Sequence, residues 1–145
     1  MAKFAQGKFQ VKNPNKYVGL STPMARSSWE FVFMKMLDEH DGIESWASES
    51  IKIPYRDPLT GKQTVYVPDF FIVYVDKNGK KHAELIEVKP ANQTFIDKVG
   101  KSQYNQQQYV KNMAKWEAAR HYCKQHNIVF RIVNESDIFH QGGKK

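Results

Sequence analysis

Two acidic residues and one lysine lie in stretches of the chain that are rich in apolar and β-branched residues. Asp69 lies within residues 65–75, and Glu87 and Lys89 lie at the end of residues 83–89. A charge buried in a sheet without a partner is costly, so each group needs an opposite charge or an ion. Two carboxylates and an ammonium group are the groups that metal-assisted hydrolysis of a phosphodiester uses. The pattern indicates this chemistry if the three side chains meet.

Whether they meet depends on the turn between the two strands. A two-residue loop of Asn78 and Gly79 would place Asp69 opposite Val88 and separate the acids onto opposite faces. A longer turn, with Gly79 in the left-handed conformation, would place Asp69 directly opposite Glu87. We predict the second register, in which the two carboxylates converge.

In that register Lys89, two residues beyond Glu87, projects from the same face as Glu87. Facing carboxylates repel unless a cation lies between them, and Mg²⁺ typically takes one or two protein carboxylates, several waters and substrate phosphate. The predicted cofactor is therefore Mg²⁺, with Mn²⁺ as a possible substitute. The Lys89 ammonium could orient or help deprotonate the attacking water, or stabilise the charge that develops on the phosphate.

The elements that must position these residues follow from hydrophobic spacing and turn residues. The last strand is expected to run parallel to a neighbour because a crossover helix precedes it. The fold class is therefore α/β, with a central mixed β-sheet of a three-strand meander and a further strand, flanked by helices. In chain order, the prediction is a helix over 27–39, strands over 51–56, 64–75 and 82–89, a helix over 102–126 and a strand over 128–133.

The charge of the chain favours a polyanionic partner. Its 145 residues carry a formal net charge of +7, and no acidic residue precedes position 30. Because Pro, Gly and Asn break any regular period there, we interpret residues 1–24 as a basic, extended arm that contacts a DNA backbone; the alternative is a solubilising tail packed on the domain. The candidate DNA-binding residues are Lys3, Lys8, Lys12, Lys16 and Arg26.

The cysteine count and the hydropathy exclude other classes. Cys123 is the only cysteine, so the chain cannot form an intramolecular disulfide or a Cys-based zinc site, which fits a reducing cytosol. The longest apolar run, residues 70–75, is far shorter than the roughly 18 residues that span a bilayer. We therefore expect a protein that neither spans a membrane nor carries a usual export signal.

The pairing of Pro68-Asp69 with Glu87-Val88-Lys89 on adjacent strands resembles the PD-(D/E)xK nuclease superfamily, whose core has the element order predicted above. Within it, the chain resembles the head completion nucleases of T-even-like tailed phages, relatives of the TnsA-like transposon end-cleaving endonucleases. The stretches that carry this resemblance are Lys12-Asn13-Pro14, Ser27-Ser28-Trp29-Glu30, Trp46-Ala47-Ser48-Glu49, Ile53-Pro54-Tyr55-Arg56, Val67-Pro68-Asp69-Phe70-Phe71 and Glu87-Val88-Lys89-Pro90.

The resemblance implies a restriction-endonuclease-like core over residues 25–140, with residues 141–145 as a flexible basic tail. The tail prediction rests on Lys144 and Lys145 following Gly142 and Gly143. The resemblance implies that Asp69, Glu87 and Val88 bind the metal and that Lys89 serves the water or the phosphate. TnsA-like enzymes commonly have Gln where this chain has Glu87, so the triplet follows the wider superfamily.

The resemblance also implies a setting for the protein. A virion-associated DNase would act on DNA ends during head maturation, in the bacterial host cytoplasm and the virion, with phage head or portal proteins as partners. A double-strand break by one active site per chain would need a dimer or two encounters. Asn105, not Gln, stands four residues before Tyr109, so the Q-x-x-x-Y motif of the exonuclease branch is missing.

Simpler interpretations stay open for several of these residues. The resemblance implies that Glu30 is a catalytic acid, yet Ser27 and Glu30 also form a capping-box pattern. Glu49 is a rival for the third acid. Glu87 and Lys89 could form a plain ion pair on a sheet rim, although that explains Asp69 poorly. The alternative function is a non-catalytic DNA-binding or capsid-associated protein that retains the nuclease fold.

Overall fold

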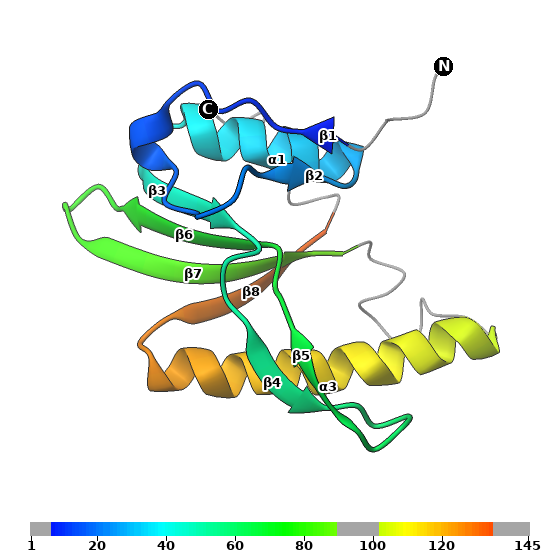
Figure 1. Ribbon diagram of the computed structural model, residues 1–145. Coiled ribbons are helices and arrows are strands. Elements are labelled where there is room, and N and C mark those ends of the chain that lie inside the picture. The colour runs from blue at the N-terminus through cyan, green and yellow to red at the C-terminus, as the bar shows by residue number, and fades with distance from the viewer. Residues whose placement is uncertain (1–6, 90–101, 135–145) are drawn as a thin grey trace.

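A central sheet lies between two helices, α1 and α3, in the computed structural model, which describes residues 7–89 and 102–134 (Figure 1). The sheet has the strand order β3-β6-β7-β8, in which β3, β6 and β7 are antiparallel and β8 is parallel to β7. This mixed sheet confirms the predicted α/β class. The described elements are β1 (Gly7–Lys8), the 3₁₀ helix η1 (Pro14–Lys16), β2 (Met24–Ala25), α1 (Ser28–Glu39), β3 (Ile43–Ser48), β4 (Ile53–Arg56), β5 (Gln63–Tyr66), β6 (Phe70–Val75), β7 (Lys81–Val88), α3 (Gln103–Gln125) and β8 (Val129–Val133).

Both helices begin and end close to where the sequence predicts. The Ser27 hydroxyl caps α1 by accepting a hydrogen bond from the Glu30 N–H at 3.1 Å, and Ser102 caps α3 in the same way. Asn127 follows α3 with a φ of 60°, a left-handed conformation that Asn tolerates and that ends a helix. The predicted helices over 27–39 and 102–126 are confirmed.

The register between β6 and β7 is the one that brings the acids together. The strands pair from Phe70 opposite Ile86 to Val75 opposite Lys81, so the next position of the ladder places Asp69 opposite Glu87. The turn has Gly79 at a φ of 81°, which a residue without a Cβ adopts at little cost. The predicted longer turn and its register are confirmed.

The prediction of one continuous strand over 64–75 is wrong. The part of this segment that precedes Pro68 lies outside the central sheet. Pro68 is fully buried and has no N–H to donate to a strand ladder. The N-terminal half, β5, pairs instead with β4 in a separate two-stranded ribbon. The second half, β6, stays in the sheet, so Asp69 lies at the point where the chain enters it.

The predicted meander also had the wrong first strand. The strand at 51–56 is β4, which lies outside the central sheet, and β3 takes its place beside β6. The pairing of β3 with β6 shifts between Ile43 and Ser45, which breaks the alternation of apolar and polar residues by which a strand is recognised. The meander is therefore β3-β6-β7.

Each face of the sheet is covered by one helix and has its own core. On one side Phe33 and Leu37 of α1 pack with Trp46, Phe70 and Ile86. The cluster on the other side joins α3 to the sheet and the β4-β5 ribbon, and it contains Ile53, Tyr55, Tyr66, Leu85, Trp116, Ala119 and Cys123. Because both faces are buried, a charged side chain can remain in this sheet only at its ends or beside a partner.

The described part of the predicted N-terminal arm, residues 7–24, lies against α1 and β3. The backbone N–H groups of Lys12 and Asn13 donate to the buried carboxylate of Asp38 at 2.8 and 3.2 Å. The Lys16 ammonium donates to the carbonyl oxygens of Asp38 and His40 at 3.0 and 2.8 Å. These carbonyls belong to the end of α1, where a cation is favoured by the helix dipole.

Burial makes the Cys123 thiol a testable marker of this core. Burial raises the pKa of the thiol from its ordinary value of 9.0 to about 11. Because the thiolate is the reactive form, its fraction at neutral pH falls about a hundredfold. We expect Cys123 of the folded protein to react with a thiol-specific disulfide reagent at least about a hundredfold more slowly than Cys123 of the chain unfolded in urea. Equal rates in the two states would contradict the packing of α3 described above.

Among the described residues, neither helix combines the length and the apolar composition that crossing a membrane requires.

Candidate active site

The carboxylates of Asp69 and Glu87 meet at one end of the central sheet. Asp69 precedes β6 and Glu87 lies near the end of β7, directly across the ladder. The Val88 N–H donates to Asp69 Oδ2 at 2.8 Å, which fixes the aspartate against the neighbouring strand. Glu87 is a buried residue, with 6% of its surface exposed. The fold thus brings together the two acids that the sequence predicts.

Glu87 is held by groups from two different elements. The Tyr66 hydroxyl, at the end of β5, donates to Glu87 Oε1 at 2.7 Å. The Lys89 ammonium lies 3.8 Å from Glu87 Oε2, and its side chain is 26% exposed. The carboxylate therefore has one oxygen on a buried hydroxyl and the other beside a cation that solvent can reach.

The pKa values of this cluster are displaced by burial and by neighbouring charge. Burial raises the pKa of Asp69 well above its ordinary value, and the nearby charges of Glu87 and Glu30 raise it further. Burial also raises the pKa of Glu87, against the lowering effects of Lys89 and Tyr66. Both shifts show that the site as it stands disfavours the charged carboxylates, and a cation bound beside them would offset that penalty.

Glu30 reaches this cluster and also caps its own helix. One of its carboxylate oxygens accepts a hydrogen bond from the Arg26 N–H at 3.1 Å, as in a capping box displaced by one residue. The same carboxylate lies close enough to raise the pKa of both Asp69 and Glu87, and burial raises its own pKa. The two interpretations of Glu30 are therefore compatible.

Glu49, the rival third acid, lies beside Asp69 and is paired with Arg26. Its N–H donates to the Asp69 carbonyl at 2.9 Å, and it has a φ of 51°, unusual for a residue other than Gly, Asn or Asp. Its two carboxylate oxygens accept from Arg26 Nε and Nη2 at 2.8 and 3.1 Å. Such a bidentate pair leaves Glu49 less free than Glu30 to bind an additional cation.

The predicted DNA-binding residues have different surroundings. Lys8 and Lys12 are exposed, and Lys12 lies 3.6 Å from Glu39. Lys16 and Arg26 already have the partners described above. Lys3 and the basic residues of the C-terminal tail lie outside the described residues.

Two residues of the site were missed from the sequence. Tyr66 reaches Glu87 only because the chain turns out of the sheet between β5 and β6. Lys115 comes from α3, where its ammonium lies 5.6 Å from the centre of the Tyr66 ring, and its charge bears on Glu87. No local pattern separates Tyr66 from a core aromatic residue or Lys115 from a surface lysine.

The residues present fit a hard divalent cation. No group of three or more His, Cys, Asp and Glu residues that could hold a metal occurs among residues 7–89 and 102–134. Mg²⁺, however, needs only one or two protein carboxylates, because waters and substrate phosphates complete its coordination. Two carboxylates at the same end of the sheet, Asp69 and the buried Glu87, are the donor set that such an ion requires.

Removal of the Tyr66 hydroxyl tests how Glu87 is held. Because Tyr66→Phe deletes the 2.7 Å hydrogen bond but keeps the ring, Glu87 would lose its orienting donor. We expect phosphodiester cleavage to fall about 10- to 100-fold, and the divalent-metal concentration for half-maximal activity to rise. Titration of activity with Mg²⁺ measures both effects. A variant with wild-type values would show that Tyr66 does not position Glu87.

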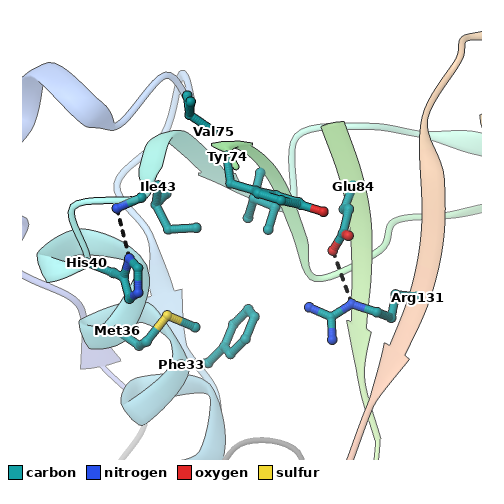
Figure 2. Close-up of a pocket in the computed structure, with 10 residues that line it drawn as sticks. Phe33, Met36, His40, Ile43, Tyr74, Val75, Glu84 and Arg131 are labelled. Atoms are coloured by element: carbon teal, nitrogen blue, oxygen red, sulfur yellow. Dashed lines mark hydrogen bonds and ion pairs between the residues drawn. The ribbon is translucent and has the colours of Figure 1, made fainter. Parts of the chain in front are cut away.

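A cavity lies away from this cluster, between α1 and the sheet. It has a volume of about 460 Å³ and includes Phe33, Met36, Ile43 and Tyr74 in its lining. Figure 2 shows the ion pair between Glu84 and Arg131 at its edge, with an Nε to Oε1 distance of 3.0 Å. The cavity shares no residue with the acid cluster, so the two are separate features of the fold.

Comparison with known proteins agrees with the geometry of the acid cluster. No curated protein matches the chain. A model of the TnsA-like endonuclease N-terminal domain matches residues 40–135, a range that contains Asp69, Glu87, Lys89 and Lys115 but not Glu30. A nuclease of this kind has DNA as its substrate. The chain therefore belongs to the family of TnsA-like endonuclease N-terminal domains.

Proposed function

We propose that this protein is a Mg²⁺-dependent endodeoxyribonuclease that hydrolyses phosphodiester bonds, with Mn²⁺ as a possible substitute. One observation carries the proposal. Asp69 lies across the strand ladder from Glu87, and the Lys89 ammonium lies 3.8 Å from Glu87 Oε2. Family membership supports a nuclease, and the net charge of +7 supports a polyanionic substrate.

Each residue of the cluster has a proposed role. Asp69, Glu87 and the backbone of Val88 would hold the metal, and Glu30 would assist from α1. When bound, the metal would supply Lewis-acid stabilisation of the phosphate charge. The partly exposed Lys89 would hydrogen-bond to the attacking water or to the phosphate oxygen on which charge develops. Tyr66 would keep Glu87 oriented.

The proposed substrate is a DNA end that is processed during phage head completion and DNA packaging. The resemblance of several sequence stretches to phage head completion nucleases supports this setting, which includes the bacterial cytoplasm, the virion and head or portal proteins. Exposed Lys8 and Lys12 are the proposed backbone contacts among the described N-terminal residues. Arg26 could contact a phosphate by releasing Glu49, whereas Lys16 is already held at the end of α1.

Metal binding can be tested before any substrate is known. A ligand that binds only the folded state raises the melting temperature, so millimolar Mg²⁺ should raise that of the wild-type protein. Asp69→Asn keeps the shape of the side chain but removes its charge, and should abolish the rise. Glu44→Gln removes an exposed carboxylate elsewhere and should leave the rise unchanged. Equal shifts in all three proteins would contradict the proposed metal site.

A further inference from the structure

Lys115 is a half-buried cation of α3 whose charge acts on the acid cluster. It lies in the middle of α3, the helix that crosses the lower face of the sheet in Figure 1. Lys111, one turn earlier, lies 3.6 Å from Asp57. By contrast, Lys115 forms no ion pair within 4.0 Å with any residue in the described part of the chain.

The surroundings of Lys115 connect it to Glu87 through Tyr66. Its ammonium lies 5.6 Å from the centre of the Tyr66 ring, and the hydroxyl of that ring donates to Glu87. Glu87 also has Lys89 on its other oxygen at 3.8 Å. The Lys89 ammonium, from the residue directly after β7, therefore lies within ion-pair distance of this carboxylate, and the Lys115 ammonium from α3 acts on it at longer range.

This arrangement puts the Lys115 ammonium in a position that penalises its charge, although the charges of Glu87 and Asp57 offset part of the penalty. Burial lowers the pKa of Lys115, and the charge of Lys89 lowers it further. A lysine kept in a half-buried position beside another cation would gain most from an anion that approaches from solvent. Its ammonium lies over the Tyr66 ring, a contact that favours this position of the charged group.

We propose that Lys115 binds a backbone phosphate of the DNA, next to the phosphate that is cleaved. This inference rests on the proposed function and adds a substrate contact from α3 to the groups of the sheet. Lys89 acts at the reacting phosphate, and Lys115 holds the neighbouring one, so the strand is fixed at two points.

The experiment measures DNA affinity in the Asp69→Asn background, in which the duplex is not cut. The Kd of the Asp69→Asn protein for a short labelled duplex is measured from low to high salt. The same measurement is made on three double variants, which add Lys115→Ala, Lys115→Arg or Lys124→Ala to Asp69→Asn. Lys124 is an exposed lysine of the same helix, so its loss is a matched change of charge. The two alanine variants and Lys115→Arg are also made in the active protein for KM and kcat.

We expect Lys115→Ala to raise Kd about three- to tenfold and to lower the slope of log K against log salt by about one, as the loss of one phosphate contact predicts. We expect Lys115→Arg to keep Kd and the salt slope close to those of the parent, and Lys124→Ala to change neither quantity. In the active protein, KM rises by a larger factor than that by which kcat falls.

Two results would overturn the inference. If Lys115→Ala changes Kd and the salt slope no more than Lys124→Ala does, Lys115 is not a phosphate contact. If kcat falls while Kd is unchanged, Lys115 acts through Glu87 and not on DNA. Failure of the proposed function differs from both: the wild-type protein would then not cut DNA in Mg²⁺, whatever its affinity for the duplex.

Discussion

Replacing Lys89 with alanine should lower DNA cleavage by about 10²- to 10⁴-fold, the range expected for loss of an acid-base or charge-stabilising group. Lys89 is the one residue proposed to act on the water or the phosphate without binding the metal. Its side chain is 26% exposed, so its truncation leaves no large cavity. Single-turnover cleavage of a labelled duplex measures the effect directly.

The same variant should keep its response to metal. Because Asp69 and Glu87 remain, Lys89→Ala should still show a rise in melting temperature with Mg²⁺. Lys81→Ala is the matched control, since it removes an exposed lysine from the other end of β7. Cleavage by Lys89→Ala within threefold of this control would exclude Lys89 from the chemistry.

Replacing Trp46 with alanine should lower the free energy of unfolding by about 3 to 5 kcal/mol. Trp46 is fully buried in β3 and lies 4.7 Å from Tyr17, 6.0 Å from Phe9 and 6.3 Å from Phe70, measured between ring centres. It therefore joins the N-terminal segment to the central sheet. Because domains are stable by only about 5 to 15 kcal/mol, the loss would be readily measured by urea unfolding followed by circular dichroism.

Trp46→Phe is the control that separates packing from hydrogen bonding. The indole nitrogen of Trp46 is buried and has no hydrogen-bond partner among the described residues. Phenylalanine removes that unsatisfied donor but keeps an aromatic ring, so we expect a loss of no more than about 2 kcal/mol. If both variants lost the same stability, the aromatic contacts of Trp46 would not be what holds the segment in place.

The predictions from sequence succeeded where a single residue decides the outcome. Gly79 can adopt a positive φ at little cost, and this favours the turn that places Asp69 opposite Glu87. The capping serines and Asn127 likewise mark the helix ends by local hydrogen bonding and backbone preference. For this reason the register and the helices were predictable without any tertiary information.

The predictions failed where long-range contacts override local preference. The β-branched residues around Val65 predict a strand correctly, but they do not show that β5 pairs with β4 outside the central sheet. The irregular pairing after Ile43 hides β3 in the same way. Tyr66 and Lys115 become part of the site only through these tertiary arrangements, so their types and spacing alone did not indicate it.

A plasmid cleavage assay tests most directly whether Asp69 and Glu87 form a metal-dependent nuclease site. The purified wild-type protein and Asp69→Asn are each incubated with supercoiled and linear plasmid, in Mg²⁺ and in EDTA. We expect cutting by the wild-type protein in Mg²⁺, none in EDTA, and a loss of at least about 10³-fold in the variant. Cutting in EDTA, or equal cutting by the wild type and Asp69→Asn, would contradict a metal-dependent nuclease site at Asp69 and Glu87.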